Sequence, residues 1–322
     1  MTFFTSLLGA VPGAAAQGLI WGLMAIGVYI TFRVLDVADL TVDGSLATGG
    51  AVCVMLIRSG WNPWLALLCA AAAGAVAGLL TGLLHTKCGI PAILAGILTQ
   101  LALYSMNLRI LGGKANQSVG VDKYELLVSQ RYVRQLDWSN PLPLLLIFTV
   151  VLVALLYWFF GTEQGCAVRA TGANANMARA QGINTDSKIL LGLMLSNALV
   201  AMAGGLLAQY QGAADVNMGR GAIVIGLAAV IIGEVLCKAT LDKTRFGKRF
   251  SFLSVMLAVT AGGVVYYIVV VTVLWLRLNS NDLKLITALI VALFLAVPYL
   301  KEQRVSSFGK FKKAAKEGQD HA

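Results

Sequence analysis

The sequence predicts an all-α protein that crosses a membrane several times, and three observations support this. First, the 322 residues are 58% hydrophobic and only 12% charged, whereas soluble domains carry about 25% charged residues. Second, apolar runs recur that are long enough to cross a bilayer, for which about 20 residues suffice. Third, the basic residues gather in short segments between these runs and at the C-terminus. That distribution is typical of membrane topology and does not favour nucleic-acid binding.

With about 20 apolar residues for each span, we predict nine transmembrane helices, with eight or ten as alternatives. The second predicted helix is short and Gly-rich, and so is the start of the seventh, so either is expected to be a broken or re-entrant segment. Residues 1–300 form a single transmembrane domain, and residues 301–322 form a basic tail. The predicted spans are 13–32, 43–58, 62–84, 90–111, 141–160, 188–210, 217–237, 251–275 and 283–300.

Lys and Arg predict the orientation, because loops on the cytoplasmic side of a membrane are enriched in them. If loop 161–188 faces the cytoplasm, about twice as many basic residues lie inside as outside. The N-terminus is then outside and the C-terminus is cytoplasmic. An even number of spans would move the N-terminus and little else. The tail is expected to lie against anionic lipid, with binding to a protein partner as the alternative.

The polar stretch 161–188 lies between two long apolar runs and cannot sit in hydrocarbon. Its Gly residues at 165, 172 and 182 separate segments rich in Ala and Met, which predicts one or two short helices. A rigid helical loop in the middle of a membrane protein suggests a place where another protein exerts force.

Two other stretches resemble each other, and this predicts an inverted-topology repeat. Asp39–Gly44 and Asp215–Gly221 each follow a long apolar helix and open a Gly-containing one. In the predicted topology one runs outward and the other inward, as in many transporters.

Polar residues inside or beside the spans are costly unless they are paired or face a cavity. We interpret seven of them as candidates for the lining of a translocation path. The alternative is that they cap helix N-termini or form interhelical hydrogen bonds. Asp43 and Arg220 lie in the same stretches, and for these two we favour capping of helix N-termini. The candidates for the path are Asp39, Thr41, Gln100, Asn107, Asn197, Gln209 and Asn217.

Familiar catalytic and nucleotide-binding motifs are missing from the sequence. It contains no Walker A loop, no His-Glu-x-x-His and no Gly-x-Ser-x-Gly, and its five cysteines are scattered singly. We therefore expect no enzymatic activity, no bound metal and no cofactor in this chain, and we interpret the cysteines as reduced core or interface residues. Uphill transport would then draw its energy from an ion gradient or from a separate ATPase.

Several blocks together resemble the permease subunits of bacterial ABC importers, in the branch that handles branched-chain amino acids and ribose-type sugars. The resemblance covers about residues 13 to 300. It departs from the family at Gly233-Glu234, where a Gly-Gly pair is usual, and we expect Glu234 to meet a basic partner or Lys238. The blocks that carry the resemblance are Gln17–Gly27, Asp39–Gly44, Gly89–Thr99, Gly165–Asn184, Asn197–Gln209 and Met218–Gly221.

The resemblance implies a permease in the bacterial inner membrane, with two copies forming the path. Two cytoplasmic ATPase subunits would bind ATP, and an extracytoplasmic binding protein would deliver the solute to the outer loop 112–140. That loop is alternatively a structural cap. Arg169, Asn174 and Asn176 are expected to contact the ATPase, although Arg169 could instead bind lipid headgroups. The coupling residues implied by the resemblance are Gly165, Arg169, Ala170, Gly172, Asn174, Asn176, Ala178 and Gly182.

The function predicted from the sequence is import of a small polar solute, for which an amino acid is favoured over a sugar or nucleoside. A gradient-driven secondary transporter is the main alternative. The scarcity of Asp, Glu and His within the spans disfavours it. A membrane scaffold or an enzyme subunit is the third hypothesis.

Overall fold

The computed structural model describes residues 2–120, 123–133, 140–237 and 251–275, together with positions 288, 289 and 292. Helices occupy eight of the nine predicted ranges. The ninth range, 283–300, and the tail 301–322 lie outside the described residues, except for those three positions. The long helices are α1 (Thr2–Tyr29), α2 (Thr41–Arg58), α3 (Pro63–Thr86), α4 (Ala92–Ile110), α5 (Pro141–Gly161), α8 (Thr185–Gln211), α9 (Ala222–Leu236) and α11 (Ser251–Trp275).

Six of the described helices are long and apolar enough to cross a membrane, namely α1, α3, α4, α5, α8 and α11. Helix α9 is apolar but shorter, and α2 has most of its 18 residues buried inside the protein. The all-α membrane class is therefore confirmed, whereas the total of nine spans stays a prediction. The five cysteines all lie in the described residues and form no disulfide. Cys88 and Cys166 are exposed, so of the two alternatives, core or interface, only the interface stays a prediction for them.

Local sequence explains where the helices begin. Helices α3 and α5 start in the same way, with an Asn cap followed by Pro at the first helical position. The side-chain oxygen of Asn62 accepts a hydrogen bond from the Trp64 amide at 2.9 Å, and Asn140 accepts from the Leu142 amide at 3.0 Å. Asn satisfies an otherwise unpaired amide, and Pro has no N–H to satisfy. Both helix starts therefore lie within a residue of the positions predicted from the sequence.

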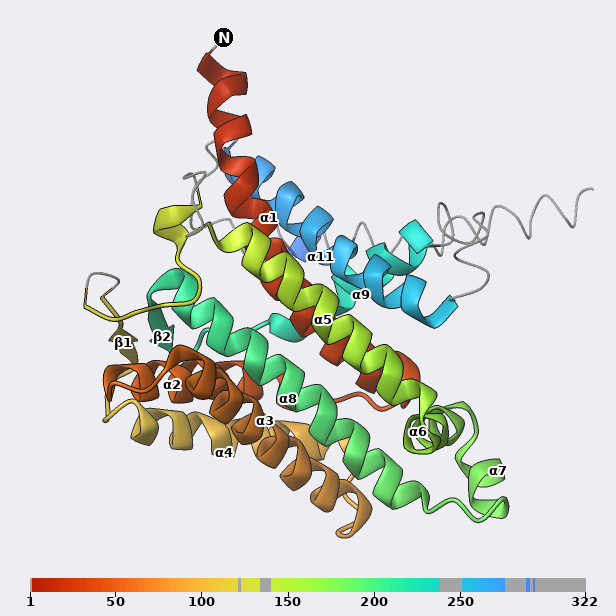
Figure 1. The fold of residues 1–322 in the computed structure, drawn as a ribbon. Coiled ribbons are helices and arrows are strands. Elements are labelled where there is room, and N and C mark those ends of the chain that lie inside the picture. The colour runs from red at the N-terminus through yellow and green to blue at the C-terminus, as the bar shows by residue number, and fades with distance from the viewer. Residues whose placement is uncertain are drawn as a thin grey trace, which may run out of the picture.

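Helix α8 crosses the bundle between α2, α3 and α4 on one side and α1, α5 and α11 on the other (Figure 1). Its contact with α3 depends on glycine. A Cβ added at Gly74 or Gly78 would overlap the backbone carbonyl oxygens of Asn197 or Leu193 on α8. Gly18 brings α1 against α11 in the same way. Small residues at four-residue spacing thus let helices of this chain pack closely against one another.

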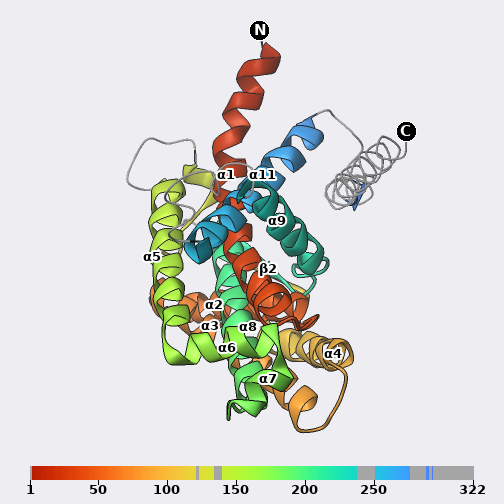
Figure 2. The same ribbon diagram turned by 90° about the vertical axis from the view of Figure 1, so that its right-hand side faces the viewer.

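The bundle has loop structures at two opposite ends (Figures 1 and 2). At one end, strands β1 and β2 pair antiparallel, with Asn116 opposite Asp215, and the 3₁₀ turn η2 lies nearby. At the other end, two short helices follow α5, and α1 continues into a π-helix, η1. The remaining elements are η1 (Ile30–Val34), β1 (Asn116–Ser118), η2 (Gln130–Tyr132), α6 (Glu163–Ala173), α7 (Ala175–Ala180) and β2 (Ala213–Asp215).

Substitution of Gly78 by Ala should destabilise the protein, because the new methyl group overlaps the α8 backbone. Overpacking of this kind lowers the free energy of unfolding by about 1–3 kcal/mol. The matched control is Gly161→Ala, where no atom lies within 4 Å of the added Cβ. Thermal unfolding in detergent, followed by size-exclusion chromatography, should show a lower midpoint for Gly78→Ala only. Equal midpoints would contradict the close contact between α3 and α8.

Candidate functional site

The loop 161–188, which we call the coupling loop, contains two short helices, as predicted. Thr162 caps α6 by accepting from the Gly165 amide at 3.4 Å. Asn174 ends α6 and caps α7, and its side-chain oxygen accepts from the Met177 amide at 3.0 Å. Asn184 caps α8 through the Ser187 amide at 3.2 Å. Successive polar caps therefore determine where each short helix begins.

Two glycines hold α6 directly against the ends of longer helices. A Cβ at Gly165 would overlap the Phe159 carbonyl oxygen near the end of α5. A Cβ at Gly172 would overlap the Val34 carbonyl oxygen, at the end of η1. Gly182 has a φ of +83°, which a turn before α8 requires and which other residues rarely adopt. The coupling loop is thus packed onto the bundle by backbone contacts.

Arg169 extends from α6 toward α11. Its guanidinium lies 5.5 Å from the centre of the Phe252 ring, and its Nη2 donates to the sulfur of Cys166 at 3.3 Å. An arginine over an aromatic face is attracted by the ring's electrons. This contact ties α6 to α11, while a contact of Arg169 with an ATPase stays a prediction.

Much of the coupling loop is exposed. Ala170, Asn174, Asn176 and Gly182 are exposed, whereas Ala178 is buried. Met177, an apolar side chain, is 63% exposed in the middle of this polar loop. The sequence analysis did not single out Met177, although an exposed methionine between alanines is the kind of apolar contact that a protein partner covers.

Three side-chain contacts fasten the short helices of the coupling loop to the start of α8. The Arg179 Nη2, on α7, donates to the Thr185 hydroxyl at 2.9 Å and lies 3.8 Å from the Asp186 carboxylate. The Lys188 ammonium, on α8, donates to the Gln164 side chain on α6. Both short helices are therefore attached to the helix that follows them.

A buried polar network occupies the middle of the bundle. Asp39, only 3% exposed, accepts from the Thr41 amide at 2.8 Å and from the Asn197 amide group at 2.7 Å. The Asn197 oxygen accepts from the Ser45 hydroxyl at 2.6 Å. The start of α2 is thereby hydrogen-bonded to the centre of α8.

The network continues through threonine hydroxyls. The Thr41 and Thr81 oxygens lie 2.7 Å apart, and Thr81 donates to Thr99 at 2.9 Å. All three side chains are buried, and they connect α2, α3 and α4. Asp39, Thr41 and Asn197 thus form interhelical hydrogen bonds, the alternative left open by the sequence. A role for them in a path stays a prediction.

The other path candidates form none of the hydrogen bonds of this network. Gln209 is buried near the outer loop, where its oxygen accepts from the Leu127 amide at 3.0 Å. Asn107 is fully buried on α4, and neither polar atom of its side chain has a hydrogen-bond partner. Gln100 is half-buried on the same helix, and Asn217 is exposed before α9. A place for these residues in a translocation path stays a prediction.

For two charged residues the sequence predicted the kind of contact but not the distant partner. The Asp43 carboxylate accepts from the Gly221 amide at 2.9 Å and from the Ile223 amide at 3.0 Å. It therefore caps α9, a helix other than its own, while Arg220 is exposed beside it. Glu234 has its expected basic partner, which is Arg33 with 2.5 Å between Nη2 and Oε2. Lys238 lies outside the described residues.

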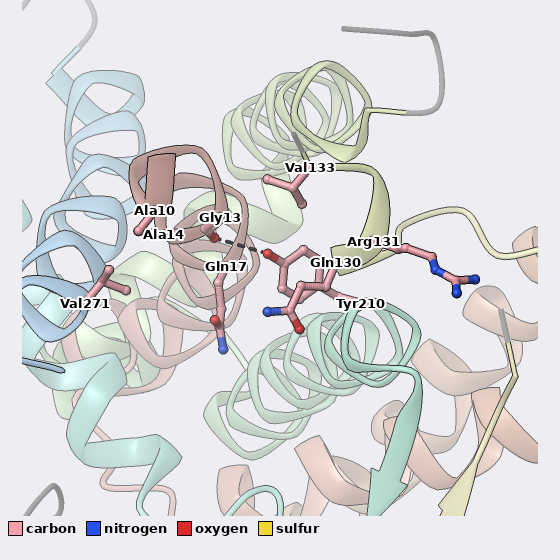
Figure 3. Close-up of a pocket in the computed structure, with 9 residues that line it drawn as sticks. All are labelled: Ala10, Gly13, Ala14, Gln17, Gln130, Arg131, Val133, Tyr210 and Val271. Carbon is pink, nitrogen blue, oxygen red and sulfur yellow. Dashed lines mark hydrogen bonds between the residues drawn. The ribbon is translucent and has the colours of Figure 1, made fainter. Parts of the chain in front are cut away.

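At the end opposite the coupling loop, a pocket of about 430 Å³ opens between α1, α8, α11 and the outer loop (Figure 3). The Tyr210 hydroxyl donates to the Gly13 carbonyl at 3.2 Å across it, and Gln17 donates to Tyr267 at 3.2 Å. Figure 3 shows the Arg131 side chain directed away from the other lining residues. The pocket is lined by Ala10, Gly13, Ala14, Gln17, Gln130, Arg131, Val133, Tyr210 and Val271.

Comparison with known proteins identifies the family. Residues 11–298 match the family model described as the permease component of the branched-chain amino acid transport system. The chain belongs to this family. A tyrosine transport system permease protein of Clostridioides difficile is 37% identical to it over 90% of this chain and 91% of its own length. The chain is accordingly a multi-pass inner-membrane permease of the ABC importer type, and this family consists of transport proteins.

Two further matches are more distant. The autoinducer 2 import system permease protein LsrC of Yersinia pestis is 30% identical over 69% of this chain and 60% of its own length. Among solved structures, PsaBC from Streptococcus pneumoniae in complex with Fab matches 81% of this chain and 94% of its own, with 13% identity and a TM-score of 0.41. At that score the structural match adds nothing to the family assignment.

Replacement of Asn197 by Ala should destabilise the permease. Asp39 would lose one of its donors and Ser45 its acceptor, and buried polar groups left unpaired cost about 1–3 kcal/mol. Asn217→Ala is the control, because that side chain is exposed. Thermal unfolding in detergent should separate the two variants. Equal unfolding temperatures for Asn197→Ala and Asn217→Ala would contradict a structural role for the network.

Proposed function

We propose that this permease is the membrane subunit of an ATP-driven importer, and that the coupling loop is where a cytoplasmic ATPase acts on it. The observation that carries the proposal is the position of α6. Backbone contacts hold this helix against the ends of α5 and η1, and Arg169 holds it against α11. A force on the exposed face of the loop would therefore be transmitted directly to α5, to α11 and to α1 through η1, because no flexible linker lies between them.

The proposed solute is an amino acid. The family description and the similarity to the tyrosine transport system permease support this class. The similarity to LsrC keeps a sugar-like solute as the second candidate. An extracytoplasmic binding protein would deliver the solute at the outer loop, next to the pocket in Figure 3.

Proposed partners are two ATPase subunits and a second copy of the chain, with the N-terminus outside and the C-terminus in the cytoplasm. The fold is compatible with this orientation, because the coupling loop and the outer loop lie at opposite ends of α5 and α8 (Figure 1). The ATPase contacts proposed for Asn174 and Asn176 are consistent with the exposure of both residues.

An inverted repeat within nine spans is part of the same proposal. Asp39 accepts from the amide two residues ahead at 2.8 Å, and Asp215 accepts from the Asn217 amide at 2.6 Å. Each of these turns directly precedes a Gly-containing helix, α2 or α9. The glycine contacts of α3 with α8 also resemble those of α11 with α1. These likenesses support two related halves.

The decisive experiment is reconstitution of the permease in proteoliposomes with a co-expressed ATPase and binding protein. Uptake of labelled tyrosine or leucine should require ATP and the ATPase, and ribose should compete poorly. The control is the permease alone under a proton or sodium gradient. Uptake in that control would refute the proposal and favour a secondary transporter, and preferred uptake of ribose would move the solute to the sugar class.

Substitution of Gly172 by Ala should uncouple the permease, because the methyl group overlaps the Val34 carbonyl and lifts α6 from its position. A misfit of about 1.4 kcal/mol lowers the population of the packed loop about tenfold. ATP-dependent uptake should fall accordingly, while Gly161→Ala transports normally. Wild-type uptake by folded Gly172→Ala would show that the close packing of α6 on η1 is not required for transport.

A further inference from the structure

The ion pair between Arg33 and Glu234 joins two helices at the coupling-loop end of the bundle. Arg33 lies in η1, at the end of α1, and Glu234 lies in the last turn of α9, 201 residues later. Their side chains are 48% and 21% exposed.

The segment that carries Arg33 is irregular and lies directly under the coupling loop. Residues Ile30–Val34 form a single π-helical turn, and Asp36 after it has a φ of +55°, uncommon for a residue other than glycine. Single π-helical turns occur frequently at functional sites. Gly172 of α6 packs on the Val34 carbonyl. A Cβ added at Gly172 would lie only 2.8 Å from the Leu35 Cα, so no space is left between α6 and this segment. Movement of α6 must therefore move η1.

Glu234 is held just as closely on the other side. The preceding residue, Gly233, packs against α11, where an added Cβ would lie 2.6 Å from the Ala258 carbonyl oxygen. Helix α11 in turn carries Phe252 under Arg169 of α6. The contacts form a closed ring that runs from α6 through η1, the ion pair, α9 and α11, and back to α6.

Tyr29, one residue before η1, contacts the same phenylalanine as Arg169 does, with its aromatic ring 6.3 Å from that of Phe252. Within the closed ring of contacts, two side-chain links can open without disturbing a packed backbone contact, the ion pair and the contact of Arg169 with Phe252, and the ion pair is the one that joins η1 to α9.

We propose that Arg33 and Glu234 are positioning residues that hold the end of α9 to the end of α1 in the state seen here, and that the pair opens when α6 moves. This inference rests on the proposed function. A partly exposed ion pair contributes little to folding. A pair that forms in only one of two states nevertheless shifts the equilibrium between them, here by about two- to fivefold.

The test compares Arg33→Gln, Glu234→Gln and the charge swap R33E/E234R in the reconstituted full complex. Both single variants should raise ATP hydrolysis without solute about two- to fivefold and lower the solute imported per ATP by a similar factor. The charge swap should restore both quantities toward wild type. Arg58→Gln, an exposed arginine at the end of α2, is the matched control and should leave both unchanged. Size-exclusion chromatography confirms that each variant is folded.

The outcomes separate this inference from the proposed function. Folded single variants with wild-type coupling, or a charge swap no better than the single variants, would overturn the inference alone. Wild-type uptake without any ATPase would overturn the proposed function and the inference together. If a neutral variant fails to fold, Arg33→Lys and Glu234→Asp replace it. These variants keep the charges but change the length of the side chains. The solute imported per ATP should therefore lie between the wild-type value and that of the neutral variants. Wild-type coupling in both conservative variants would likewise overturn the inference.

Discussion

The hydrogen bond between Asn197 and Asp39 is the contact on which the arrangement of the bundle depends. It lies where α8 meets the start of α2, and the carbonyl of Asn197 is also the group that Gly74 of α3 approaches. In a membrane, a polar group without a partner is costly, and irregular backbone is tolerated only where protein covers it. The linker before α2 is such a backbone, and Asn197 together with the Thr41 amide satisfies the carboxylate that it brings into the interior.

The protein uses different interactions at its centre and at its coupling loop. The centre is held by buried side-chain hydrogen bonds, whereas the coupling loop is held by glycine-to-carbonyl contacts and by arginines over an aromatic ring or a carboxylate. Backbone contacts resist displacement because packed atoms leave no room to shift. Exposed ion pairs are weaker and can exchange partners. A stiff loop beside an exchangeable ion pair is suited to a protein that must change between two packed states.

Much of the fold could be predicted from the sequence, because its signals are local. Asn140 followed by Pro141 marks the start of α5, and the Gly breaks in 161–188 mark the short helices. Contacts between distant residues could not be predicted. Neither the capping of α9 by Asp43 nor the partner of Glu234 leaves a trace in nearby sequence, since 180 and 201 residues separate the groups.

The candidate site shows the same division. The sequence marked Asp39 and Asn197 as polar residues within apolar surroundings, and the structure joins them. Gln209 and Asn107 had the same signature but lie apart from that pair, because polarity within a span reveals that a residue needs a partner without revealing which one. Nothing in the sequence indicated that the guanidinium of Arg169 lies over Phe252, because only the three-dimensional packing of α11 creates that contact.

Helix α8 has one further consequence. Its 27 residues correspond to about 40 Å at 1.5 Å per residue. Arg179 is fastened to its first turn, and Gln209 near its last turn holds the backbone of the outer loop. A helix does not change length readily, so an axial displacement of one end appears at the other. A displacement at the end of α8 near Gln209 would therefore be transmitted to the end near Arg179 by a single rigid helix, without a chain of intervening rearrangements.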